Sequence, residues 1–134
     1  MENAAFSIVN YQFEKVSINL ENHKSSELSI NFICSGIYNQ EGASYELSFN
    51  VTVFNPDTEP FVSMQCKATF QFYKVTEITE IPDFFYANSI AILFPYVRAY
   101  LSLVTTQANV PGVILPTLNL SYLEDELRRN TRPK

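Results

Sequence analysis

Glycine, histidine and tryptophan are scarce in this sequence, since its 134 residues contain three glycines, one histidine and no tryptophan. Phosphate-binding loops and dinucleotide fingerprints need closely spaced glycines, and none of those motifs occurs here. The single histidine, His23, lies in a polar segment (residues 22–26), where we expect a solvated loop residue. No zinc motif or nucleophile elbow is present either. We therefore expect no enzyme activity, no metal and no cofactor.

Cysteines and long apolar runs are also few. Cys34 and Cys66 are too few for a disulfide scaffold, and both fall at apolar positions of predicted strands. The longest apolar stretch, residues 90–95, is far shorter than the ~20 residues that span a bilayer. A basic segment followed by an apolar run, as in a signal peptide, is not seen. These features predict a cytoplasmic protein with reduced thiols and no membrane insertion.

Basic residues are outnumbered, with 9 Lys and Arg against 14 Asp and Glu, for a net charge of −5. A nucleic-acid partner is not expected, because such proteins present a basic surface. The end of the sequence differs, since three acids at 124–126 precede four bases between 128 and 134. One interpretation is a solvated helix end with bases at the negative pole of the helix dipole, and the other is a docking role. We expect residues 128–134 to be a flexible tail.

Length and composition predict one globular domain over residues 1–134. Apolar residues make up 46% and charged residues 17%, which is unlike a disordered chain. A chain of this length suits a single core.

The first three-fifths of the sequence has the alternation of β-strands. Apolar residues recur every second position in four segments, at residues 6–20, 28–34, 45–53 and 62–72. The first segment changes register at Ile8–Val9 and again at Glu14–Lys15, which predicts two β-bulges or bends. Because one face is apolar and the other polar, we predict a four-stranded antiparallel meander that is solvated on one side. Gly42 is expected to take a positive φ in the turn between the second and third strands.

Helical spacing replaces the alternation after Ile81. Apolar residues at intervals of three and four predict a helix over residues 88–107, with Asn88 as N-cap. Pro95 either kinks this helix or lies in its first turn. A last short helix is predicted from Ser121, which has capping-box spacing with Glu124. The expected fold class is α+β, with one long and one short C-terminal helix covering the sheet.

The long helix has more apolar surface than one sheet can cover. A second stripe, formed by Ile92, Tyr96 and Tyr100, lies beside the first. A helix between two sheets, one from another copy, explains both stripes. The residues that we expect at an oligomer interface are Leu93, Tyr96, Val97, Tyr100 and Leu101.

Two further apolar runs exceed what one small core can absorb. Phe84, Phe85 and Tyr86 are consecutive, and so are residues 113–115. Such runs cannot face one core in full, so they indicate either an oligomer interface or a groove for apolar ligands.

The run from Ile92 to Leu101, ILFPYVRAYL, closely resembles the signature of the SecB family of export chaperones. In that family a strand meander leads into a helix written L-F-P-Y-A-R-E. Val110-Pro111, Leu115-Pro116 and Asn119-Leu120 resemble the stretch that follows this helix. The order of four strands, a long helix, a proline-rich crossing and a short helix is also similar.

The resemblance implies a homotetramer, built as a dimer of dimers, that binds unfolded or pre-secretory polypeptides in apolar grooves without ATP. In such proteins the groove uses the proline-rich stretch and the short helix. The resemblance therefore implies client contacts at Val113, Leu115, Leu118, Leu120, Tyr122 and Leu127, with Phe84 and Phe85 as additions.

The sequence departs from export SecB where the SecA motor docks. Lys15 and Asn19 occupy positions at which that family has carboxylates, and the end of the chain is basic. Binding to SecA is therefore doubtful. Two alternatives remain open: a chaperone dedicated to one client, such as an antitoxin, and a structural oligomer or apolar-ligand-binding protein without chaperone activity.

Overall fold

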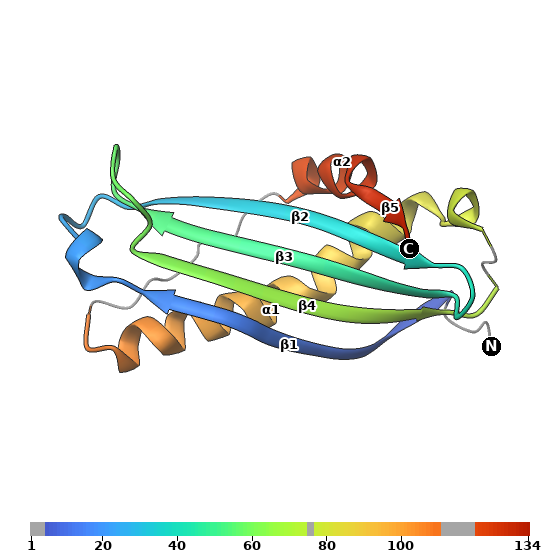
Figure 1. Ribbon diagram of the computed structural model, residues 1–134, viewed down its shortest axis with the longest axis horizontal. Coiled ribbons are helices and arrows are strands. Elements are labelled where there is room, and N and C mark those ends of the chain that lie inside the picture. Colours follow the sequence, from blue (N-terminus) through green and yellow to red (C-terminus); the bar gives the residue numbers. More distant parts are fainter. Residues whose placement is uncertain (1–4, 75–76, 111–119) are drawn as a thin grey trace.

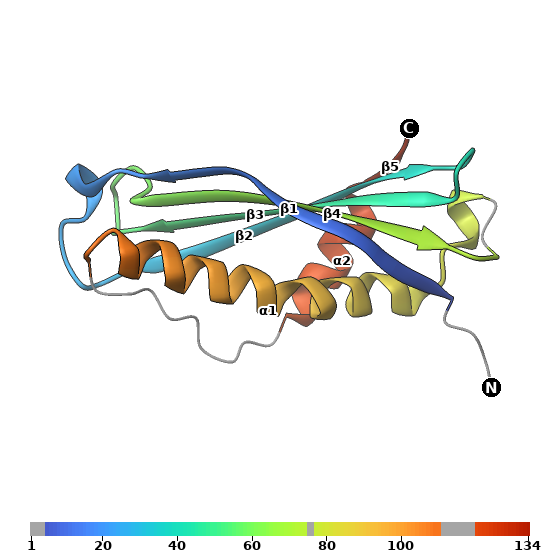
Figure 2. The ribbon, with the colours of Figure 1, turned by 90° about the horizontal axis from the view of Figure 1, so that it is seen from below.

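The computed structural model describes residues 5–74, 77–110 and 120–134. These residues form one sheet with the strand order β1-β4-β3-β2-β5, and α1 lies along one of its faces (Figures 1 and 2). The elements are β1 (Phe6–Ile18), η1 (Leu20–Asn22), β2 (Ser29–Asn39), β3 (Ser44–Phe54), β4 (Val62–Phe72), η2 (Ile78–Glu80), α1 (Asp83–Gln107), α2 (Ser121–Arg129) and β5 (Thr131–Pro133). The α+β fold class predicted from the sequence is confirmed: four main antiparallel strands, a short fifth strand, and one long and one short helix.

The strand β1 joins the sheet beside β4, whereas β2, β3 and β4 follow one another as a meander. The connection between β1 and β2 must therefore cross one end of the sheet. The buried side chain of Asn55 holds this connection in place. Its Oδ1 accepts a hydrogen bond from the backbone N–H of Lys24 at 2.6 Å, and its Nδ2 donates to the carbonyl of Glu27 at 2.7 Å. One side chain thus fixes the path that carries the chain from one edge of the sheet to the other.

Two bulges keep the apolar residues of β1 on one face. The register with β4 shifts between Ile8 and Asn10 and again between Phe13 and Lys15, at the two places predicted from the sequence. Each extra residue resets the alternation of the strand. The apolar residues on either side of both bulges consequently lie opposite the inward-facing residues of β4.

The core lies between the inner face of the sheet and α1. Buried and partly buried residues alternate along all of β3 and β4, as the period of two predicted. Phe85 at the start of α1 is fully buried, and its ring lies 4.7 Å from that of Tyr45 and 4.8 Å from that of Phe72. These edge-on and tilted ring contacts anchor the helix on the sheet.

The helix α1 begins at Asp83, five residues before the predicted start, and its N-cap is Pro82 rather than Asn88. Apolar periodicity could not reveal this start, because the first turn contains three consecutive aromatic residues. Pro95 lies inside the helix, which continues through it to Gln107. Pro95 is flanked by Leu93, Phe94 and Val97, all buried against the sheet, and this packing offsets the loss of one backbone hydrogen bond.

By length and composition alone, α1 resembles a membrane span, and it is the only such helix in the described part of the chain. Its packing explains this composition. Nine of its residues are buried against the sheet and its neighbours, including Ile90, Leu93 and Leu101. The apolar character of α1 is that of a core helix.

Two predicted details of turns and caps are wrong. The helix α2 begins at Ser121, as predicted, but Ser121 is its first residue and Leu120 is the N-cap. In the turn between β2 and β3, the positive φ of 52° belongs to Ala43 and not to Gly42. Ala43, the fourth residue of this loop, takes the left-handed conformation that reverses the chain. The alternation of apolar residues in the strands does not indicate which loop residue takes it.

Residues 128–134, for which the sequence predicts a flexible tail, include the end of α2 and the strand β5. Arg128 and Arg129 complete α2, and Thr131–Pro133 form β5, parallel to β2. A buried hydrogen-bond chain holds β5: the hydroxyls of Tyr45 and Thr131 are 2.6 Å apart, and Thr131 donates to the carbonyl of Leu127 at 2.7 Å. These contacts join residues far apart in sequence, so local patterns could not predict them.

Candidate functional site

Several large apolar side chains remain exposed on the side of the molecule that carries α1 and β1. β1 is an edge strand, and α1 covers the sheet without covering all of β1 (Figure 2). We define the β1–α1 surface as Tyr11 and Val16 of β1 with Ile92, Tyr96 and Leu103 of α1, which are 36–54% exposed. The three α1 residues share one face of the helix, because they are four and seven residues apart.

Aromatic stacking joins β1 to α1 within this surface. The rings of Tyr11 and Tyr96 stack at 4.4 Å, and those of Phe13 and Tyr100 stack at 4.0 Å. These contacts hold the aromatic rings of α1 against β1 within the single chain.

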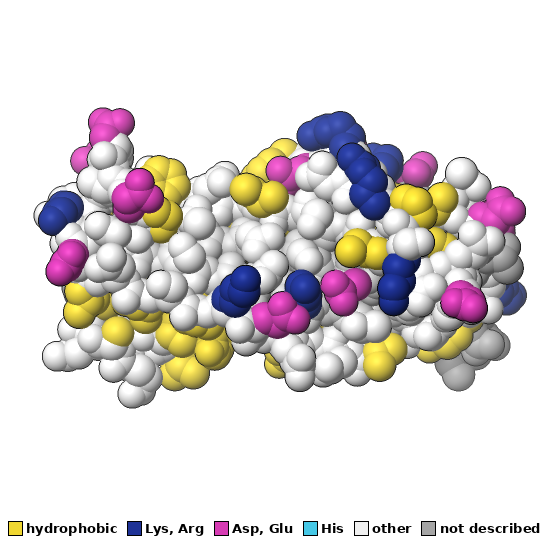
Figure 3. All heavy atoms as spheres, viewed as in Figure 1, with side chains coloured by type: hydrophobic (Ala, Val, Ile, Leu, Met, Phe, Trp, Pro, Cys, Tyr) yellow, Lys and Arg dark blue, Asp and Glu magenta, His cyan; other side chains and the backbone are white. Residues whose placement is uncertain are grey.

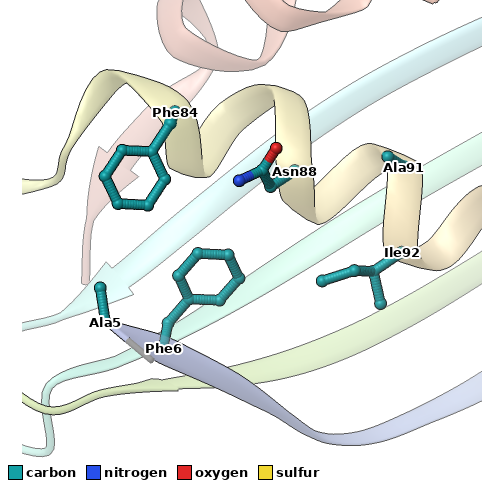
Figure 4. Close-up of a pocket in the computed structure, with 6 residues that line it drawn as sticks. All are labelled: Ala5, Phe6, Phe84, Asn88, Ala91 and Ile92. Carbon is teal, nitrogen blue, oxygen red and sulfur yellow. The ribbon is translucent and has the colours of Figure 1, made fainter. Parts of the chain in front are cut away.

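A hollow of about 500 Å³ lies at one end of this surface, between the start of β1 and the first turns of α1 (Figure 4). Figure 4 shows the rings of Phe6 and Phe84 and the side chain of Ile92 around it. Asn88 is the polar side chain among those that line it. The hollow is open to solvent, and its chemistry suits an apolar side chain rather than a charged ligand.

A second, smaller hollow of about 220 Å³ lies between α1 and α2. Ala87, Ile90 and Ala91 of α1 line one side, and Leu120 and Ser121 line the other. Leu120 is half-buried against the core, while Tyr122 on the next part of α2 is 57% exposed. Apolar side chains thus continue from α1 to Leu120 at the start of α2, and Glu124 of α2 also lines this hollow.

Arg128 fixes α2 against the start of α1. Its guanidinium lies 2.8 Å from a carboxylate oxygen of Asp125 and 3.7 Å from one of Asp83, and it sits 5.0 Å above the ring of Tyr86. The negative ring face and the two carboxylates favour the cation in this position. This contact holds the hollow between the helices at a fixed width.

The predicted client-contact residues divide into three groups. Val113, Leu115 and Leu118 lie outside the described residues. Phe85 and Leu127 are fully buried in the core of the chain itself, whereas Leu120, Tyr122 and Phe84 are half-buried or exposed on the side of α1 and α2. The described residues that remain accessible for client contact are these last three.

The predicted interface residues also divide. Leu93, Val97 and Leu101 are fully buried between α1 and the chain's own sheet, while Tyr96 is 44% exposed and Tyr100 is half-buried. Of the two apolar stripes predicted from the sequence, the one with Leu93, Val97 and Leu101 therefore faces the core. The stripe with Tyr96 and Tyr100 is partly exposed. Tyr11 and Val16 were missed as surface residues, because their alternation is typical of a buried strand. Their exposure follows from the edge position of β1, which the sequence pattern does not encode.

In the described part of the chain, neither the β1–α1 surface nor the two hollows contains a cluster of reactive side chains. Within residues 5–74, 77–110 and 120–134, no group of three His, Cys, Asp or Glu side chains is arranged to hold a metal ion. Burial raises the pKa of the Cys34 thiol to about 12 and that of Cys66 to about 11, so both remain protonated at neutral pH. His23 packs edge-on against the ring of Phe61 at 4.7 Å. The candidate site is therefore an exposed apolar surface.

No family model matches the sequence. An uncharacterized protein of Methanocaldococcus jannaschii, MJ0357, is 50% identical over 66 residues, which are 45% of this chain and 43% of that protein. The match thus spans less than half of either protein. A protein of unknown function from Streptococcus agalactiae superposes with a TM-score of 0.40 at 19% identity, covering 85% of this chain and all of that one.

One solved structure matches most of the chain. It is the SecB-like chaperone Rv1957 of Mycobacterium tuberculosis, in complex with a ChAD peptide from the HigA1 antitoxin Rv1956. The TM-score is 0.67 and the identity 13%, over 85% of this chain and 91% of that one. The chain therefore has the fold of the SecB-like chaperones, as the run around Pro95 predicted.

Proposed function

We propose that this protein is an ATP-independent molecular chaperone, a holdase that binds unfolded or pre-secretory polypeptides in apolar grooves. The observation that carries the proposal is the apolar surface that α1 and α2 leave accessible, with Phe84 and Leu120 beside two hollows and Tyr122 exposed on α2. The SecB-like fold supports it, since the matching chaperone was solved with a bound peptide.

The mechanism follows from the chemistry of the surface. A non-native chain exposes apolar segments that otherwise associate with one another. A surface that covers these segments lowers the concentration of free unfolded chain and so slows aggregation. The binding needs no nucleotide, because it is driven by burial of apolar area.

A light-scattering assay tests this function directly. Addition of the protein to a reduced, unfolded test protein is expected to suppress aggregation without ATP, at a stoichiometry set by the assembled chaperone. An equal mass of an unrelated acidic protein is the control. Aggregation at the same rate in both samples would contradict the proposed function.

Client binding is expected to weaken when the accessible apolar side chains at the start of α2 are replaced by polar ones. Leu120→Ser combined with Tyr122→Ser removes two apolar contacts, each worth about 1.5–3 kcal/mol at most. Because holdase contacts are spread over many side chains, we expect binding of an unfolded client to weaken about tenfold or more. The affinity is measured by titration with a fluorescently labelled, reduced client.

Tyr73→Ser is the matched control for this variant, since Tyr73 is 56% exposed and Tyr122 is 57% exposed. Tyr73 follows β4, and its hydroxyl lies 2.6 Å from that of Ser7 on β1. The Tyr73→Ser variant should leave the affinity for the client unchanged. Circular dichroism checks that both variants keep their helix content. If the double variant binds clients as tightly as the wild type, the groove lies elsewhere.

The proposal includes a homotetramer, a dimer of dimers, in the cytoplasm. An isolated chain leaves the β1–α1 surface in water, together with the edge of the 13-residue strand β1. Such an edge is a template for pairing with another chain. A second copy of this chain, which would cover both, is the proposed occupant.

Delivery of clients to SecA is not part of the proposal. Lys15 and Asn19 are both exposed on β1 and beside its end, where export chaperones carry carboxylates. Each reversed rim charge costs about 1 kcal/mol, mainly through a slower association rate. Calorimetry at physiological salt is therefore expected to show weak or absent SecA binding, and submicromolar affinity would contradict this expectation.

Two alternatives remain. A chaperone dedicated to a single client, such as an antitoxin, is favoured by the peptide bound to the similar chaperone. Such a protein would protect one client in the light-scattering assay and leave unrelated unfolded proteins to aggregate. A structural oligomer or an apolar-ligand-binding protein would form the assembly and protect none.

A further inference from the structure

The outer face of the sheet, opposite α1, carries an apolar pair of residues on β2. Ile33 is 48% exposed and Ile37 is 44% exposed, and both alternate with buried residues of the same strand. Nearby strands present polar side chains on this face, such as Asn50 and Lys67. The two isoleucines lie on the same side of β2, four residues apart, with Ser35 between them on that face.

Basic side chains lie beside Ile37, which is the isoleucine next to β5. The parallel register of β2 and β5 puts Arg132 directly beside Ile37. Lys134 and Ile37 line the same shallow hollow of about 170 Å³, and Arg129 is exposed at the end of α2. Figure 3 shows the Lys and Arg side chains gathered over α2 and β5, with hydrophobic side chains next to them.

The Arg132 guanidinium is held in position before any partner arrives. Its Nη1 donates hydrogen bonds to the carbonyls of Arg129 at 2.7 Å and of Thr131 at 3.1 Å. The bases therefore depend on the order of β5, which is anchored by the buried contact between Thr131 and Tyr45. Because less side-chain freedom is lost on binding, such a fixed cation is better suited to recognition than a mobile one.

The nearest acidic residues are engaged elsewhere. Glu46, which also lines the hollow, pairs with Lys67 at 3.7 Å. Asp125 pairs with Arg128, and Glu126 accepts a hydrogen bond from the backbone N–H of Cys34. In the described part of the chain no ion pair involves Arg129, Arg132 or Lys134. A concentrated positive charge thus remains on a protein whose net charge is −5.

We propose that this β2–β5 surface, formed by Ile33, Ile37, Arg129, Arg132 and Lys134, docks an acidic segment of a partner protein that also carries apolar side chains. The bases select carboxylates, and the two isoleucines supply apolar contact between them. A nucleic acid fits less well, since it would meet isoleucines at the centre and a negatively charged protein around them. The surface faces away from α1, so this proposal does not depend on the proposed client groove.

Synthetic peptides test this surface by fluorescence anisotropy with the full chain. We expect a labelled peptide of alternating glutamate and leucine to bind, and to bind more weakly as salt is raised. Peptides of alternating lysine and leucine, or of glutamate and serine, should not bind. An anionic lipid vesicle and a single-stranded oligonucleotide are tested in parallel. Binding to either of these without binding to the acidic apolar peptide would overturn the proposal.

Two variants locate the binding. Arg129→Gln with Arg132→Gln is expected to weaken peptide binding about tenfold, since it removes two of the three cations that would meet the carboxylates of the peptide. Ile37→Ser should weaken it without altering any charge. Lys15→Gln with Lys24→Gln removes the same charge elsewhere and should change nothing. Unchanged binding in both surface variants would overturn the assignment.

The aggregation assay separates this inference from the proposed function. The Ile37→Ser variant is expected to suppress aggregation as the wild type does, because Ile37 lies on the face of the sheet opposite α1. Loss of peptide binding with normal suppression supports two separate surfaces. Equal loss of both activities would mean that the peptide occupies the client groove, which contradicts the proposal.

Discussion

Gly36→Ala is expected to lower the free energy of unfolding by about 3 kcal/mol, through overpacking and loss of a buried hydrogen bond. A methyl group at Gly36 would overlap the hydroxyl and ring of Tyr45, which is fully buried. The Tyr45 ring cannot retreat without breaking its 2.6 Å contact with the Thr131 hydroxyl. Denaturant unfolding followed by circular dichroism measures the change.

Gly42→Ala is the control for this prediction. Its added methyl would meet no heavy atom closer than the Ser44 hydroxyl at 3.7 Å. Alanine is otherwise better tolerated than glycine in a strand, by about 0.5–1 kcal/mol, so the overlap decides the sign at Gly36. Equal stability of the two variants would mean that Tyr45 does not fill the space beside β2.

Tyr96→Asp is expected to dissociate the proposed assembly while leaving the chain folded. Tyr96 is 44% exposed in the single chain, so a charge there is tolerated in the monomer. In the assembly the same charge would be buried without a partner, which costs about 3–5 kcal/mol. Multi-angle light scattering should report about 61 kDa for the wild type, four times the 15.3 kDa chain, and a smaller mass for the variant.

Ile33→Asp introduces the same charge at a residue of similar exposure on the opposite face of the sheet. It should leave the mass unchanged. Leu101→Asp is not a suitable test of the interface, because Leu101 is fully buried in the chain's own core and its replacement would unfold the monomer. A wild-type protein that is monomeric at micromolar concentration would contradict the assembly.

The two bulges of β1 show how much a local pattern can encode. The alternation of β1 changes at Ile8–Val9 and again at Glu14–Lys15. The apolar residues stay on the core side of the strand because one extra residue, a β-bulge, is inserted at each of these points. The run around Pro95 was similarly informative, and its resemblance to SecB is confirmed at the level of fold. Local periodicity and motif therefore determined the four main strands, the presence of the long and the short helix, and the fold class.

The position of β1 beside β4, and the exposure of Tyr11 and Val16 that follows, were decided by tertiary structure. Alternation tells which residues share a face, but it contains no information on which strand lies at an edge. The same reason applies to Leu127 and Phe85, which look like free apolar surface in the sequence and are buried in the core.

The end of the chain gives the clearest contrast. Its sequence, acidic and then basic, has no apolar alternation and predicted a flexible tail. In the folded chain Thr131 bonds to Tyr45, 86 positions away, and Arg132 lies beside Ile37. Such contacts form only because the sheet and α2 are already in place. The sequence alone thus determined the charges of the β2–β5 surface, and only the tertiary structure put them beside two exposed isoleucines.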